Sequence, residues 1–211
     1  MEQPDADPKS ETRLLNEAVH HIANHGLEGL EIRALAEKAG TSTSQFVRHF
    51  GQKERLITAV FERGWSSIER SVGLSLLQPV SSLEDVVAAV LNGVLDALEE
   101  DTDAVSAALI IARSTFGNDV RLNIRNTTAH TRFFTLVHRL SDQFEKLLLS
   151  PDEAREVLEL LYGAALHRLV LATPMCRSTS LKFDRQVFIR LMHRMVHGLL
   201  TNPASANADS A

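Results

Sequence analysis

Cysteine is almost absent from this sequence: the chain contains one, Cys176, so no disulfide bond can form within it. An apolar segment of the secretory type is also missing near the amino terminus. The longest apolar stretch, residues 158–172, is interrupted by His167 and Arg168 and is too short to span a bilayer. These absences exclude a disulfide-stapled scaffold and a membrane-spanning protein, and they predict a cytoplasmic protein without a membrane partner.

Glycine and proline are scarce as well, with 10 and 6 residues, and aromatic residues make up only 5% of the 211 positions. Alanine, leucine, valine, glutamate and arginine are abundant instead, and this composition favours helices. No internal repeat and no strand-like alternation of apolar and polar residues is visible, and a chain of this length can bury a full core. The sequence therefore predicts an all-α fold.

The chain also lacks a net positive charge: its formal net charge is −5, which argues against unspecific binding of nucleic acid. The charges are unevenly distributed, however. Residues 38–53 contain the cations Lys38, Arg48 and Lys53 and no aspartate or glutamate, whereas acidic residues are concentrated elsewhere, for example at 99–103. This distribution predicts a local DNA-facing surface on an otherwise acidic protein.

Apolar residues recur with the 3.6-residue period of helices along most of the chain, and this period predicts about nine helices. The expected helices span about residues 11–24, 31–38, 42–50, 53–77, 82–99, 101–116, 119–149, 152–172 and 183–200. Gly26 and Gly51 each follow an expected helix, where a glycine readily ends it. Residues 1–10 and 202–211 are polar and contain prolines, so we expect both segments to be disordered.

The most informative segment is residues 13–56, which has the features of a helix-turn-helix. Ala36 and Gly40 are four residues apart, which suits the point where two helices cross, because alanine permits close approach and glycine accepts a positive φ. Phe46 and Phe50 are one helical turn apart and can anchor the inner face of the second helix. Before them, Ser42 can cap the amide of residue 45 while Gln45 reaches back, as in a capping box.

At these residues the sequence resembles the TetR (tetracycline repressor) family of one-component regulators. The family pattern is roughly IA…AGVS.G.LY.HF..KE.L, and this chain reads LAEKAGTSTSQFVRHFGQKERL. The chain departs from the pattern at Glu31, where the family usually has threonine, at Ser44, where it favours glycine, and at Val47, where it favours a phosphate-contacting tyrosine. The resemblance implies a DNA-binding domain over residues 11–52, followed by a ligand-binding and dimerisation domain over residues 53–201.

The third helix is therefore predicted to lie in the major groove of double-stranded operator DNA. Base contacts are expected from Thr43, Ser44, Gln45 and Val47, and phosphate contacts from Arg48, His49 and Lys53, with Ser42 at the cap of the helix.

The resemblance also implies two functions for the second domain. A small apolar or amphipathic effector would bind within the helical bundle, and the last two long helices would pair with their copies in a homodimer. Candidate effector-binding residues are Arg113, Phe116, His130, Phe133, Phe134 and His167, which combine apolar bulk with a few polar groups. Candidate dimer-interface residues are Leu158, Leu161, Ala165 and Leu169.

Two histidine pairs, His21/His25 and His193/His197, have the spacing of four that puts both imidazoles on one helix face, where they can chelate a transition metal. Neither pair has a third protein ligand at a local spacing, so partly exposed or interface histidines are the simpler interpretation. The sequence also lacks a nucleophile elbow, a phosphate-binding glycine loop and a metal-ligand triad. We therefore expect no metal, no cofactor and no enzymatic activity.

The sequence thus predicts a dimeric, ligand-responsive transcriptional regulator that represses until an effector releases it from its operator. Two other interpretations remain open: a DNA-binding regulator without a small-molecule effector, and a helical protein-interaction module that no longer binds DNA. Glu31 and Val47 suggest the second of these, because Glu31 would repel a phosphate and Val47 replaces the tyrosine with which the family contacts one.

Overall fold

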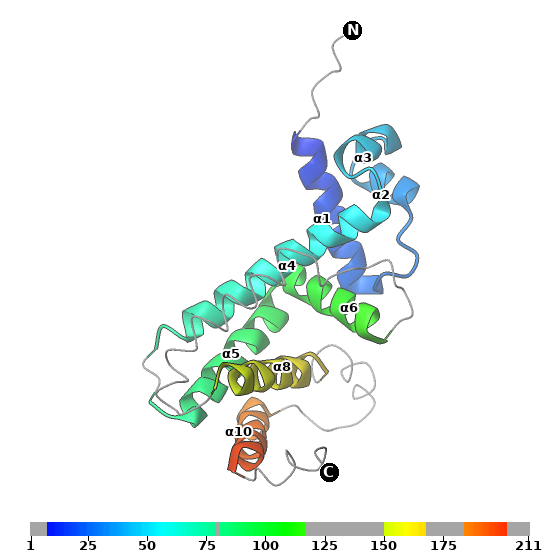
Figure 1. Ribbon diagram of the computed structural model, residues 1–211. Helices are drawn as coiled ribbons and strands as arrows, with labels where there is room; N and C mark the ends of the chain where they lie inside the picture. The colour runs from blue at the N-terminus through cyan, green and yellow to red at the C-terminus, as the bar shows by residue number, and fades with distance from the viewer. Residues whose placement is uncertain (1–7, 79–80, 117–149, 168–183, 202–211) are drawn as a thin grey trace. The chain divides into compact units, whose positions relative to one another are not determined.

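The structure is a computed structural model that describes residues 8–78, 81–116, 150–167 and 184–201 (Figure 1). All regular structure in these ranges is helical, which confirms the predicted all-α class. The helices are α1 (Pro8–His25), α2 (Ile32–Lys38), α3 (Thr43–His49), α4 (Lys53–Ser75), α5 (Leu83–Glu100), α6 (Thr102–Phe116), α8 (Pro151–Leu166) and α10 (Arg185–Thr201). Among these, no helix has the length and apolar character needed to cross a membrane.

Where the structure describes both ends of a predicted helix, the observed bounds agree to within a few residues, with one difference at the amino terminus. Helix α1 begins at Pro8, whereas the polar composition predicts disorder over residues 1–10. Proline is tolerated in the first turn because its missing amide hydrogen has no helical partner there, and Ser10 is already fully buried. Residues 1–7, the expected helix at 119–149 and the expected tail at 202–211 lie outside the described ranges.

The chain divides into two compact units, formed by residues 1–69 with 97–134 and by residues 70–96 with 135–211. In the described ranges, the first unit contains α1, α2, α3, most of α4 and α6, and the second contains most of α5, α8 and α10. This grouping differs from the domain boundary expected at residue 52, because α6 packs on α1. Each unit has its own buried apolar residues.

In the first unit, the packing of α1 against α6 includes a buried polar contact. The hydroxyl oxygen of Ser106 lies 2.9 Å from the carbonyl oxygen of Val19 in α1 and 2.9 Å from that of Thr102 in its own helix. Ser106 is fully buried, and a buried hydroxyl is tolerated when it is hydrogen-bonded. The contact therefore fixes the position of α6 along the axis of α1.

Helix α4 crosses α6 at very short range in the same unit. A Cβ atom added to Gly64 would lie 2.0 Å from the carbonyl oxygen of Asp103 and 2.7 Å from the Cβ of Ala107, so only glycine fits. Beside the crossing, Arg63 of α4 donates through Nε to Asp103 of α6 over 2.7 Å and through a guanidinium NH to Asn16 of α1 over 2.6 Å. This side chain joins three helices of the first unit.

The second unit has a similar close approach and a well-capped helix. A Cβ atom at Gly93 of α5 would lie 2.5 Å from the Cα of Val72. Helix α8 begins with a capping box, in which Ser150 accepts from the amide of Glu153 and the Glu153 carboxylate accepts from the amide of Ser150. Such caps satisfy amides at the helix start that have no partner within the helix.

Candidate DNA interface

The turn between α2 and α3 has the geometry that the sequence predicts. Gly40 adopts a φ of +60°, the left-handed conformation that favours glycine. The amide of Thr41 donates to the carbonyl of Ala36 over 2.9 Å and closes the end of α2. Ala36 itself is buried, which lets the two helices cross closely. The turn therefore fixes the direction in which α3 leaves α2.

Helix α3 is capped by Ser42, whose hydroxyl oxygen accepts from the amide of Gln45 over 3.2 Å, as predicted. The second half of the expected capping box does not form. The Gln45 carbonyl oxygen instead accepts a hydrogen bond of 3.0 Å from the hydroxyl of Thr41. This bond fixes the orientation of the side-chain amide and leaves its NH2 group available as a donor.

The inner face of α3 is formed by Phe46 and Phe50, in agreement with their spacing. Both side chains are buried, and their ring centroids lie 5.7 Å apart. The opposite face is exposed and carries Thr43, Ser44 and Val47, with Val47 retaining 59% of its surface. An apolar side chain this exposed on a seven-residue helix is available for contact with another molecule.

The cationic residues of this region occupy different environments. Arg48 is exposed, and Lys53, the first residue of α4, is half-buried. The side chain of His49, in contrast, is only 4% exposed. Its Nε2 atom lies 2.6 Å from the hydroxyl oxygen of Ser10, and its Nδ1 atom lies 3.7 Å from the carboxylate of Glu11.

This burial argues against the predicted phosphate contact by His49. A side chain that presents almost no surface to solvent, and whose ring nitrogens both face α1, has no free donor for a phosphate. The ring contacts the first turn of α1 and holds it against the last turn of α3. Sequence reasoning could not detect this, because Ser10 and His49 are separated by 39 positions.

The amino terminus of α2 also affects the electrostatics of the interface. Glu31 occupies the N-cap position with φ −102° and ψ 126°, and its side chain makes no capping hydrogen bond. The carboxylate is exposed. A negative charge there is favourable next to the positive end of the helix dipole, but it repels a DNA phosphate.

Of the predicted effector-binding residues, the structure describes the side chains of Arg113 and His167. Arg113 and His167 are both exposed. The side chain of Phe116 and the residues His130, Phe133 and Phe134 lie outside what the structure describes.

The predicted dimer-interface residues require a correction. Leu161 and Ala165 have no exposed surface in the single chain, so a partner has nothing to contact there. The Leu158 side chain and Leu169 lie outside the described residues. Helix α10 instead presents an apolar stripe of exposed residues spaced by four, and these are Val187, Leu191, Met195 and Leu199, with 40%, 55%, 43% and 64% of their surface exposed. This spacing is visible in the sequence and could have identified the stripe.

The two histidine pairs also differ in their ring geometry. The ring centroids of His21 and His25 lie 5.2 Å apart with tilted planes, and those of His193 and His197 lie 6.0 Å apart and are stacked. Within the described ranges, no group of three or more histidine, cysteine or acidic side chains is arranged to hold a metal ion.

Residues 14–60 match the family model of "Bacterial regulatory proteins, tetR family". None of the curated proteins matches the chain. Among solved structures, the chain is similar to the multidrug binding protein EbrR complexed with imidazole, with 18% identity, a TM-score of 0.63, and coverage of 90% of this chain and 96% of that chain.

Two further structures are similar over most of both chains. The fatty acid degradation regulator FadR from Bacillus halodurans has 17% identity and a TM-score of 0.64, with coverage of 92% and 97%. AibR in complex with isovaleryl coenzyme A and operator DNA has 16% identity and a TM-score of 0.60, with coverage of 88% and 97%. At such identities the likeness shows a common fold.

Proposed function

We propose that the chain, whose residues 14–60 match the model of the TetR family of bacterial regulatory proteins, binds double-stranded operator DNA and regulates transcription. The observation that carries the proposal is the exposed face of α3. Its hydroxyl and methyl groups, on Thr43, Ser44 and Val47, are accessible while two phenylalanines anchor the helix from behind. A short, rigidly anchored helix with such a face suits the major groove.

Thr43, Ser44 and Val47, together with Gln45, would recognise the base sequence of the operator. The hydroxyl groups can bond to base edges, and the Val47 methyl groups can contact the methyl group of thymine. Gln45, oriented by Thr41, would donate its NH2 group to N7 of adenine. Arg48 and Lys53 would contact the DNA backbone and supply affinity that does not depend on sequence.

The proposed regulator is a homodimer, in which the apolar stripe of α10 is covered by a second copy of the chain. The stripe residues project from one side of the helix, whereas Ile189, Met192 and Val196 are already buried within the chain. Four exposed large apolar side chains in a row are unusual on a soluble monomer. Gly198 lies beside the stripe, and a Cβ atom added to it would meet no atom within 4 Å, so another helix can approach closely there.

A dimer with two copies of α3 would read two half-sites about 34–36 Å apart. We further propose that an effector bound within residues 53–201 changes this separation and so releases a repressed operator. The similar structures support this part of the proposal, because one is described as multidrug binding and another was solved with isovaleryl coenzyme A and operator DNA. The alternative is a regulator of the same DNA-binding geometry that responds to no small molecule.

The proposal is tested by selection of binding sequences from random DNA duplexes with the full-length protein. We expect enrichment of a palindrome whose half-sites are centred about one helical turn apart. The Gln45→Ala variant should then relax the preference at one base pair in each half-site, by about 1–3 kcal/mol. Arg190→Ala, on an exposed part of α10, is the matched control and should preserve the full preference. The proposal is wrong if no sequence is enriched over random DNA at moderate salt.

A further inference from the structure

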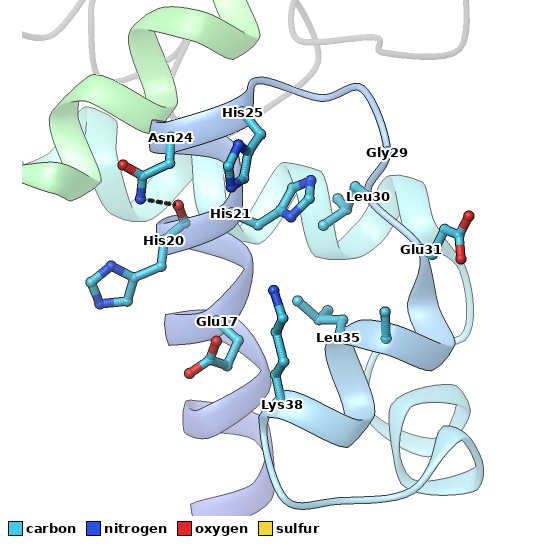
Figure 2. Close-up of a pocket in the computed structure, with 11 residues that line it drawn as sticks. Glu17, His20, His21, Asn24, His25, Gly29, Leu30, Glu31, Leu35 and Lys38 are labelled. Atoms are coloured by element: carbon cyan, nitrogen blue, oxygen red, sulfur yellow. Dashed lines mark hydrogen bonds between the residues drawn. The ribbon is translucent and has the colours of Figure 1, made fainter.

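A cavity of about 290 Å³ lies between α1 and α2, next to the helix-turn-helix formed by α2 and α3 (Figure 2). Its lining includes neither Arg113 nor His167, the two candidate effector-binding residues whose side chains the structure describes. Its walls come from the second half of α1, the connection to α2, and α2. The lining residues are Glu17, His20, His21, Asn24, His25, Gly29, Leu30, Glu31, Ala34, Leu35 and Lys38.

The apolar base of the cavity is formed by Leu30 and Leu35, which are both buried. The connection that supports it is held in place by hydrogen bonds. Nε2 of His21 lies 3.1 Å from the carbonyl oxygen of Glu28, and the amide of Gly26 donates to the carbonyl of Ile22 over 2.8 Å. The cavity is therefore largely preformed, as binding sites for small molecules usually are.

The lining of the cavity contains one lysine, Lys38. Figure 2 shows the Lys38 side chain extending from α2 toward His21, into the space that His25 and Leu30 also border. Within the described residues, the Lys38 side chain makes no hydrogen bond and no ion pair, so its three N–H donors remain available. The imidazole of His25 lies beside that of His21, with the ring centroids 5.2 Å apart.

The acidic groups at the cavity restrict what this cation can bind. Glu17 lies on the α1 side, whereas the carboxylate of Glu31 points away from the cavity in Figure 2. A nearby carboxylate repels a doubly charged anion such as inorganic phosphate about twice as strongly as a singly charged one. A single carboxylate on an apolar body is tolerated, because one ammonium group can pair with it while the leucines contact the body.

We propose that this cavity is a binding site for a small organic monocarboxylate, whose carboxylate pairs with Lys38 and whose apolar body lies between the His21/His25 rings and Leu30 and Leu35. The volume suits a body of about one ring, at the lower end of the usual size of ligand sites. If the proposed DNA-binding function holds, such a ligand acts inside the unit that carries α3, so its binding and operator binding influence each other reciprocally.

Benzoate is the probe that tests this site, with the full-length protein and NMR observation of the histidine ring and lysine side-chain signals. We expect saturable binding in the millimolar range, with shifts at His21, His25 and Lys38. The isosteric but neutral benzamide should bind at least about tenfold more weakly, because it lacks the charge that pairs with the ammonium group. Inorganic phosphate should produce no saturable shift at these residues.

Two variants locate the binding. Lys38→Met keeps the aliphatic chain at an exposed position and should weaken benzoate binding about tenfold. Arg55→Met, exposed on α4 and outside the cavity, should leave it unchanged. The proposal is overturned if benzoate does not saturate, if benzamide or the Lys38→Met protein binds equally well, or if the shifts occur only at other residues. None of these binding measurements requires DNA, so this proposal and the proposed function can fail separately.

Discussion

The hydroxyl oxygen of Ser10 lies 2.6 Å from Nε2 of His49, which joins the first turn of α1 to the last turn of α3. The bond is largely shielded from water, because Ser10 is fully buried and the His49 side chain is only 4% exposed. We therefore expect His49 to affect DNA binding by positioning α3, and Lys53 to contact phosphate directly.

The salt dependence of DNA binding distinguishes these two roles. Lys53→Ala should lower the slope of log K against log salt by about 1, because one phosphate contact and its released counterion are lost. His49→Ala should weaken binding at every salt concentration without changing the slope. Fluorescence anisotropy at several salt concentrations measures both quantities. A reduced slope for His49→Ala would instead support the direct phosphate contact by His49 that the sequence predicts.

In the proposed homodimer, the interface is formed by the exposed stripe of α10 rather than by the buried residues of α8. Leu191→Glu places a charge in the exposed stripe and should give a folded monomer, whereas Arg190→Glu, at an exposed polar position of the same helix, should remain a dimer. Leu161→Glu should instead unfold the protein, because burying an unpaired carboxylate costs several kcal/mol. Sedimentation and circular dichroism separate these outcomes. A dimeric Leu191→Glu protein would exclude the stripe as the interface.

Two glycines of α4 should respond to alanine in opposite directions. Gly64→Ala forces a Cβ atom against the backbone of Asp103 and should lower the free energy of unfolding by about 1–3 kcal/mol. Gly73 has no atom within 4 Å of an added Cβ, so Gly73→Ala should raise stability by about 0.5–1 kcal/mol through helix propensity. Urea unfolding measures both effects. Equal effects would mean that α4 and α6 do not cross as closely as described.

The start of α5 gives the protein an acid-sensitive element. The pKa of Asp85 falls from its ordinary 3.8 to about 2, chiefly because the backbone amide of Ser81 donates to the carboxylate, with further hydrogen bonds from the hydroxyl groups of Ser81 and Ser82. A lowered pKa means that folding favours the ionised form, so its contribution to stability is present above pH 4 and is lost as the pH falls toward 2.

In Asp85→Asn, the melting temperature should therefore decrease less between pH 4 and pH 2 than in the wild-type protein, because the carboxylate that titrates in this range is absent. Glu84→Gln, at the exposed neighbouring position, is the control and should retain the wild-type profile. Thermal unfolding followed by circular dichroism at each pH provides the comparison. An unchanged profile in Asp85→Asn would show that the hydrogen bonds to Ser81 and Ser82 do not persist in solution.

Local features of the DNA interface could be predicted from the sequence because they depend on neighbouring residues. The positive φ of Gly40, the cap by Ser42 and the inward direction of Phe46 all follow from conformational preference, hydrogen bonding and period over a few positions. The burial of His49 could not be predicted in this way, because its partner Ser10 comes from another helix.

The dimer residues illustrate a second limit. Leu161 and Ala165 share an apolar helix face, but that pattern does not distinguish the core of one chain from the surface between two. In the structure these residues are buried within the chain, and the exposed stripe lies on α10. The buried face of α8 and the exposed stripe of α10 show the same helical period, so only the tertiary packing distinguishes a core face from an interface.

The contact of Ser106 with Val19, across 87 positions, has a consequence for synthesis on the ribosome. Chains emerge amino terminus first, so α1, α2 and α3 leave the ribosome well before α6 does. Until α6 arrives, the face of α1 that it covers stays open to water. We expect a fragment ending near residue 60 to be only marginally folded, and the nascent protein to complete its helix-turn-helix only after about half of the chain has been translated.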